Sequence, residues 1–290
     1  MSKDSIFINP LTDFGFKYLF GRHADKEFIL SFLNSLIGAP TPIRKVTFID
    51  KENQGDSVED RALIYDLHCE MEDGSKIIVE MQNRYQTYFA DRAIYYLSAD
   101  LYSQAKKGNE WDYRLTPVYG VYLMNFEWRE VEEQHLREDV CLYNLQTRSV
   151  FSDRMRMTFL KIPMLHKDAD ECKTTLERWL YIFKHMEKME AIPQTFMRDP
   201  VFRNLGRVAR YAALSEKDKE AYKASLKAYR DAYAADEAAK ELGRSEGLAQ
   251  GLEKGRVEAF RNMVSFGISV DQIASKYGMS AEEVLKAINA

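Results

Sequence analysis

The sequence predicts a mixed α/β core followed by a helical C-terminal extension, and three observations predict it. Residues 26–37 have apolar side chains at helical spacing. Residues 63–71 and 75–82 alternate apolar and polar side chains with a period of two, as strands with one buried face do. From residue 169 onward nearly every segment has a helical pattern. Strands mixed with helices, and then helices alone, indicate an α/β core with an appended helical part.

The predicted elements of the core follow in a definite order. Gly38 ends the first amphipathic helix, because glycine is favoured just after a helix. The elements that we expect are helices around residues 13–20 and over 26–37, a strand over 44–49, the acidic hairpin, a helix over 91–107 that ends at Gly108, a buried strand over 117–126, and strands over 140–145 and 157–162.

The turn of the acidic hairpin decides which residues face each other. A two-residue type I′ turn would pair Asp66 with Met81 and put the two apolar faces on opposite sides of the sheet. A three-residue loop over 72–74, with Gly74 in the left-handed conformation and a G1 bulge, avoids that conflict. Because a buried face fixes the register, we predict the second arrangement, in which Asp66 lies opposite Glu80.

The even-numbered face of this hairpin then carries a pair of carboxylates. Carboxylates held together repel each other unless a cation or a proton lies between them. The simpler interpretation is that Asp66 and Glu80 are solvated surface residues. His68 shares this face, and we interpret it as a polar surface residue outside the site. We expect the whole face to be polar, with no core volume on it.

Composition excludes several classes of protein. The length of 290 residues suits one large domain plus an appendage, and a net charge of −4 excludes a general polycation that coats nucleic acid. Three cysteines without ligand spacing suggest reduced thiols in a cytoplasmic protein. No secretory signal and no membrane span are expected, because the chain has no basic segment followed by a long apolar run.

Four short motifs, taken in this order, resemble one family. They are Pro10-Leu-Thr-Asp-Phe-Gly-Phe-Lys-Tyr-Leu-Phe-Gly21, then Asp66, then Val79-Glu-Met-Gln82, then Arg92-Ala-Ile-Tyr-Tyr-Leu97. Together they resemble the PD-(D/E)xK nuclease superfamily, specifically its Rpn-like transposase branch. The resemblance runs from Asn9 to about Glu190.

This resemblance implies a restriction-endonuclease-like fold, with a mixed sheet flanked by helices, and Mg²⁺-dependent cleavage of DNA, with Mn²⁺ as a substitute. It also implies that Asp66 and Glu80 are catalytic metal ligands and that Asp13 joins the metal shell. Gln82 lies where the superfamily usually has a catalytic lysine. Because a glutamine orients water but carries no charge, Arg84, Arg92 or Lys17 could supply the missing positive charge.

Two of these residues have a second interpretation. Asp13 either ligates the metal or caps the helix that contains Lys17, and the two roles are compatible. Arg92 and Tyr96 lie four residues apart on one helix. They either face the site, where Arg92 would contact DNA, or pack as an ordinary amphipathic pair with a snorkelling arginine.

A basic segment follows the core. Arg203, Arg207 and Arg210 are spaced to share one helix face, where they would bind DNA phosphates. A solvated helix with ion pairs between its own side chains explains the same charges.

The C-terminal part has two further features. Glycines recur every fourth residue from Gly243 to Gly255, which suits either self-association of a helix into a homodimer or a flexible, partly helical linker. Residues 267–286 resemble a helix–turn–helix with a capping box at Ser280 and Glu283. Its balanced charge favours a packing module over a DNA-reading one. We therefore divide the chain into a nuclease-like core (1–190), a basic helical segment (191–235), a glycine-rich helix or linker (236–259) and a helix–turn–helix-like tail (260–290).

The sequence thus predicts a cytoplasmic, Mg²⁺-dependent DNA endonuclease linked to recombination or mobile elements. The alternative is a nuclease-fold protein that is weakly active or inactive and acts by binding DNA or protein. A helical oligomerisation scaffold is a third possibility.

Overall fold

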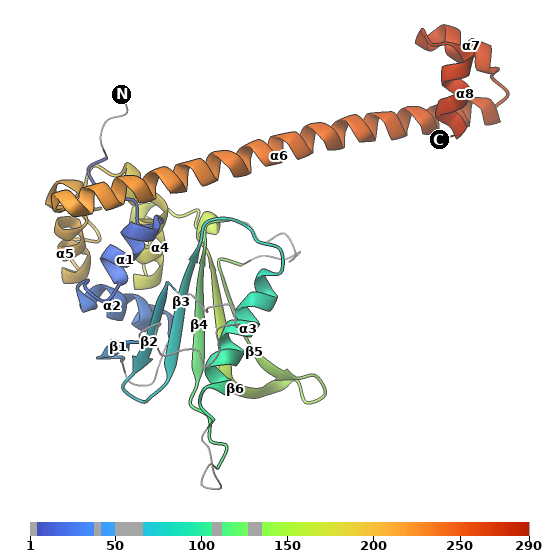
Figure 1. Ribbon diagram of the computed structural model, residues 1–290. Helices are drawn as coiled ribbons and strands as arrows, with labels where there is room; N and C mark the ends of the chain where they lie inside the picture. Colours follow the sequence, from blue (N-terminus) through green and yellow to red (C-terminus); the bar gives the residue numbers. More distant parts are fainter. Residues whose placement is uncertain (1–4, 38–41, 50–65, 106–111, 127–134, 290) are drawn as a thin grey trace. The chain divides into compact units, whose positions relative to one another are not determined.

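The computed structural model describes residues 5–37, 42–49, 66–105, 112–126 and 135–289. Its centre is a six-stranded mixed sheet in the order β1-β2-β3-β4-β6-β5 (Figure 1). The strands are β1 (Val46–Phe48), β2 (Leu67–Met71), β3 (Lys76–Gln82), β4 (Val118–Met124), β5 (Arg137–Asn144) and β6 (Ser149–Lys161). β4 lies parallel to both β3 and β6, and the other neighbours are antiparallel.

Helices come before, between and after these strands. They are α1 (Asp13–Phe20), α2 (Lys26–Ile37), α3 (Phe89–Tyr102), α4 (Thr175–His185), α5 (Pro200–Val208), α6 (Glu216–Ser265), α7 (Val270–Tyr277) and α8 (Ala281–Asn289). The predicted α/β class is confirmed: the sheet is mixed, helices flank it, and the C-terminal extension is helical.

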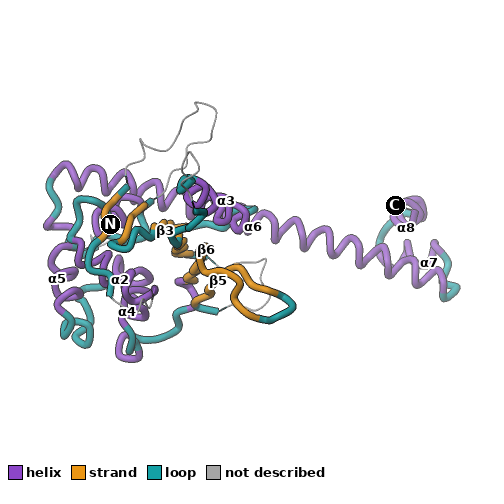
Figure 2. Tube along the Cα trace, turned by 90° about the horizontal axis from the view of Figure 1, so that it is seen from below, coloured by secondary structure: helices purple, strands orange, loops and turns teal. Residues whose placement is uncertain are grey.

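Helices cover both faces of the sheet (Figure 2). On one face the odd-numbered side chains of β2 and β3 join the core built by α1, α2, α4 and α5. On the other face Ile78 packs with Tyr122 and Phe159 under Phe89 and Leu97 of α3. The expectation of a polar even-numbered face is therefore wrong, because α3 lies on it and encloses a second, smaller core.

Several boundaries differ from the predicted ones. Helix α2 has the predicted bounds, whereas β6 begins at Ser149 rather than at residue 157. The early part of β6 pairs with β5 in a hairpin whose side chains are mostly exposed on both sides. Alternation between buried and exposed positions is therefore missing there. Gly38, the predicted end of α2, lies outside the described residues, whereas α3 ends at Tyr102 and does not extend to Gly108 as predicted.

The chain forms two compact units, residues 1–229 and 230–290. In the first, Tyr222 near the start of α6 accepts a hydrogen bond from the backbone N–H of Asn9 at 2.8 Å. In the second, Phe260 of α6 packs with Ile273 and Val284 of the two terminal helices.

The second unit contains the predicted capping box. The Ser280 hydroxyl accepts the Glu283 backbone N–H at 3.2 Å, and the Glu283 carboxylate accepts the Ser280 backbone N–H at 2.7 Å. The glycines from Gly243 to Gly255 lie inside α6, which continues through them as one helix. In the part of the chain that the structure describes, no helix is long and apolar enough to cross a membrane.

Candidate active site

The β2–β3 hairpin has the predicted register. Leu67 pairs with Val79, and at the turn the Met71 N–H donates to the Ser75 carbonyl at 2.8 Å. Gly74 has φ +80°, a left-handed conformation that glycine adopts without the steric cost of a Cβ atom. This register continues to place Asp66, directly before β2, opposite Glu80.

Hydrogen bonds tie the two carboxylates to the same end of the hairpin. Glu80 Oε1 accepts a hydrogen bond from the Asp66 backbone N–H at 3.3 Å. Asp66 Oδ2 in turn accepts the Met81 backbone N–H at 2.8 Å. Each acidic side chain therefore contacts the backbone of the opposite chain segment, and the two acids remain neighbours.

The Glu80 carboxylate is buried, with 3% of the residue exposed. The pKa of Glu80 is raised to about 7, first by burial and second by the neighbouring Asp66 carboxylate. The Arg92 guanidinium and the hydrogen bonds from Asp66 and Gln82 act in the opposite direction. Because the charged form of a buried acid is costly, this site favours a positive charge or a proton next to Glu80.

Gln82 and Arg92 both reach the same oxygen of Glu80. Gln82 Nε2 donates to Glu80 Oε2 at 3.1 Å, and Arg92 Nη2 lies 3.3 Å from that atom. The Arg92 guanidinium also lies over the Tyr96 ring, 5.3 Å from its centroid. The structure thus brings together four of the predicted site residues: Asp66, Glu80, Gln82 and Arg92.

A second polar contact joins α3 to the sheet two turns further along the helix. Asp100 Oδ2 lies 2.7 Å from His68 Nε2 on β2, and Asp100 Oδ1 lies 3.7 Å from Lys76 Nζ on β3. His68 is buried, so its interpretation as a surface residue is wrong. Sequence reasoning missed Asp100, although its spacing of four from Tyr96 and eight from Arg92 places all three on one side of the helix.

Asp13 is exposed and forms an ion pair with Lys17. Thr12, whose hydroxyl accepts a backbone N–H, is the N-cap of α1, so Asp13 does not have the capping role. The start of α1 nevertheless lies near the end of β3, because Asn83 Nδ2 donates to the Leu11 carbonyl at 2.7 Å. Among the described residues no three or more His, Cys, Asp or Glu side chains form a group that fits a metal ion, so Asp13 does not join the two carboxylates in such a group.

The three arginines of the basic segment do not share one helix face. Arg203 and Arg207 lie exposed on α5, but Arg210 lies beyond the end of that helix. There its guanidinium stacks over the Phe7 ring, 5.5 Å from the centroid. The predicted stripe is wrong in this respect, because α5 ends at Val208 before the third arginine.

Comparison with known protein families shows the family to which this chain belongs. Residues 10–239 match the PD-(D/E)XK nuclease family transposase. The chain belongs to this family. A search of curated proteins gave no match, and neither did a search of solved structures. The match extends well beyond Glu190, where the resemblance seen in the sequence ends, and it continues into α6.

PD-(D/E)XK family members typically use divalent metal ions, and membership suggests a phosphodiester hydrolase with DNA as its partner. The family match includes Asp66, Glu80, Gln82 and Arg92. These residues therefore lie within the PD-(D/E)XK transposase region and not in the helical tail.

Proposed function

We propose that this protein is a metal-dependent DNA endonuclease that acts in transposition or related recombination. The observation that carries this proposal is the buried Glu80 carboxylate, held beside Asp66 at one end of the β2–β3 hairpin. Burial of a charged acid is costly. A role as a metal ligand therefore explains the buried Glu80 better than the interpretation as a solvated surface residue does.

The donor set suits Mg²⁺, with Mn²⁺ as a substitute. Mg²⁺ takes oxygen ligands, keeps several waters, and is commonly bound through one or two carboxylates together with substrate phosphate. Asp66 and Glu80 would hold it, and Asp13 would join them after a movement of its exposed side chain away from Lys17. When bound, such an ion polarises the scissile phosphate and lowers the pKa of a bound water.

Gln82 and Arg92 supply the remaining functions in this proposal. The Gln82 amide nitrogen donates to Glu80, which leaves the amide oxygen to accept a hydrogen bond from the attacking water. Arg92 provides the positive charge that Gln82 lacks, because its guanidinium already lies 3.3 Å from the Glu80 carboxylate. A fixed charge of this kind stabilises the negative charge that develops in the transition state.

Cleavage of supercoiled plasmid DNA tests the proposal. The protein should nick or linearise the plasmid with Mg²⁺ or Mn²⁺ and should not do so with EDTA. Asp66→Ala should abolish cleavage, whereas Glu70→Gln, which changes an exposed carboxylate on β2, should not. Parent protein that binds the plasmid but never cuts it would favour the alternative, a binding protein. The uncharged Gln82 is the observation that keeps that alternative open.

DNA contacts are proposed at the exposed basic side chains. Arg203, Arg207 and Arg210 are exposed and would bind backbone phosphates without reading sequence. Arg92 would contact the phosphate nearest to the carboxylates.

We further propose a homodimer through α6. At each glycine from Gly243 to Gly255 an added Cβ atom would meet nothing within 4 Å, so the helix surface there is open. Leu242, Leu248 and Leu252 are exposed beside these glycines, and a second copy of the same helix would bury them. Deletion of residues 236–290 should convert a dimer into a monomer in light scattering and leave Mn²⁺ binding intact. A full-length protein that is monomeric at micromolar concentration would contradict the proposed dimer.

A cytoplasmic location is also proposed. Cys69, Cys141 and Cys172 are all free thiols, which suits a reducing compartment.

A further inference from the structure

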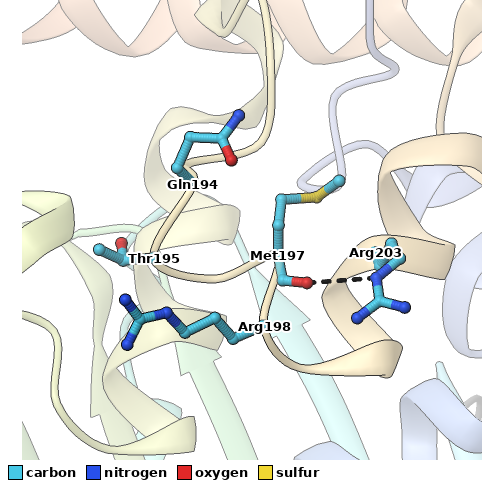
Figure 3. Close-up of a pocket in the computed structure, with 5 residues that line it drawn as sticks. All are labelled: Gln194, Thr195, Met197, Arg198 and Arg203. Carbon is cyan, nitrogen blue, oxygen red and sulfur yellow. Dashed lines mark hydrogen bonds between the residues drawn. The ribbon is translucent and has the colours of Figure 1, made fainter.

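A pocket lies in the segment that leads into α5, and no residue of the carboxylate site lines it. Its volume is about 460 Å³, and Figure 3 shows the side chains that line it. The lining residues are Gln194, Thr195, Met197, Arg198 and Arg203. Phe196 and Phe202 of the same segment are buried in the core on the face of the sheet opposite α3. The pocket is therefore built on a fixed part of the first unit.

The polar groups of the pocket are suited to an anion. The accessible polar groups of its lining are an amide and two guanidinium groups, because the Thr195 hydroxyl is enclosed, and no carboxylate lines it. Arg198 is exposed and makes no hydrogen bond or ion pair with any residue that the structure describes. Arg203 Nε donates to the Met197 carbonyl at 3.2 Å. This bond fixes the orientation of the guanidinium and leaves its terminal N–H groups for a ligand.

The two guanidinium groups point in different directions. In Figure 3 the Arg198 side chain extends to one side of Met197, and Arg203 lies on the other side. One small anion would contact one of them at a time. A ligand with successive phosphates would contact both, and the pocket has the volume of sites that bind nucleotide-sized molecules.

We propose that this pocket binds the sugar–phosphate backbone of DNA, with Arg198 at one phosphate and Arg203 at a neighbouring one. The inference rests on the proposed function, since DNA is the partner in both. Guanidinium groups bind phosphate through paired hydrogen bonds as well as through charge. Gln194 adds a neutral donor at the wall of the pocket. The contact is to the backbone, so it strengthens binding without selecting a sequence.

The test is the salt dependence of DNA binding by the full-length protein. Fluorescence anisotropy of a duplex oligonucleotide in EDTA, over a range of KCl concentrations, gives the slope of log K against log salt without cleavage. Arg198→Gln should make that slope shallower by about 1 and weaken binding equally for two unrelated sequences. Arg198→Lys should keep the slope. The matched control is Arg154→Gln, an exposed arginine on β6, which should change neither slope nor affinity.

Two results would overturn the inference. One is an Arg198→Gln slope equal to that of the parent protein or to that of the Arg154→Gln control. The other is displacement of bound DNA by inorganic phosphate at concentrations that leave ionic strength unchanged, because a single small anion would then fill the site.

These failures are distinguishable from failure of the proposed function. If the parent protein does not bind DNA at any salt concentration, both the proposed function and the pocket inference are contradicted. If the parent protein and the Glu80→Gln variant bind DNA, and Arg198→Gln binds it with an unchanged slope, only the pocket inference falls.

Discussion

Glu80 Oε1 accepts a hydrogen bond from the backbone N–H of Asp66 at 3.3 Å, so two acidic residues face each other across the β2–β3 hairpin. The bond stabilises the Glu80 carboxylate, and Arg92 and Gln82 add to that effect. Burial and the Asp66 charge nevertheless prevail and raise the pKa of Glu80 to about 7. The site therefore holds a carboxyl group that gains from a bound cation.

The first prediction concerns stability against pH in the absence of divalent cations. The pKa of Glu80 is raised from an ordinary value of 4.5 to about 7. Between these values the folded protein keeps a proton that the unfolded chain has lost. The protonated Glu80 carboxyl group therefore makes its full contribution to the free energy of unfolding at low pH. This contribution is lost as the pH rises from about 4.5 to about 7. Over this pH interval, the parent protein should lose about 3 kcal/mol of unfolding free energy relative to the Glu80→Gln variant.

Urea unfolding of both proteins at a series of pH values measures this difference. Added Mn²⁺ should restore stability to the parent protein at neutral pH and leave Glu80→Gln unchanged, because the ion replaces the proton. A difference that stays constant from acid to neutral pH would show that Glu80 titrates normally.

The second prediction concerns Gln82, which is buried and donates to Glu80. Gln82→Ala should lower the rate of DNA cleavage by roughly a hundredfold, because a positioned group beside developing charge is lost. Gln82→Lys should retain or increase the rate, because it introduces a positive charge at this position. Single-turnover cleavage measures both. An unchanged rate in Gln82→Ala would mean that Gln82 does not orient the water.

The third prediction concerns Asp100, which is fully enclosed between α3 and the sheet. Asp100→Ala leaves His68 and Lys76 without this carboxylate, and removal of one partner from a buried charged cluster typically costs about 3–5 kcal/mol. Asp91→Ala, at an exposed position of the same helix, should cost less than about 1 kcal/mol. Equal losses in chemical denaturation would show that the Asp100 cluster does not stabilise the fold.

The fourth prediction concerns Thr195. Its hydroxyl oxygen is enclosed and has no hydrogen-bond partner in the described part of the chain. Thr195→Val should therefore raise the unfolding free energy by about 1–3 kcal/mol, because an unsatisfied polar group is removed at nearly constant shape. The control is Thr158→Val, which breaks a 2.7 Å hydrogen bond to Asp139 and should destabilise the protein. A loss of stability in both variants would contradict this account of Thr195.

Local sequence signals predicted the hairpin and its acidic pair. The alternation along β2 and β3 requires a register that keeps one apolar face together, and Gly74 permits the loop that gives this register. The contact between Asp66 and Glu80 follows from it. Helix α2 was also predictable, because its apolar residues recur at helical spacing over its whole length.

Contacts between distant elements were not predictable in the same way. Asp100 is a polar residue on the buried side of α3, and its partner His68 is 32 residues away on a strand that α3 covers. Neither residue has a local signal that reveals this packing. The exposed first part of β6 lacks alternation for a related reason, since among the described strands it pairs with β5 alone.

The most direct test of the central claim is the rate of Mg²⁺-dependent plasmid cleavage by Glu80→Gln compared with that of the parent protein. Glutamine is close in shape to glutamate and removes only the negative charge, so the variant should keep the parent circular dichroism spectrum and melt at the same or a higher temperature at neutral pH. We predict that cleavage by the folded variant falls to the level seen with EDTA, while Glu70→Gln cuts at the parent rate. A folded Glu80→Gln protein that cuts DNA as fast as the parent would contradict the account.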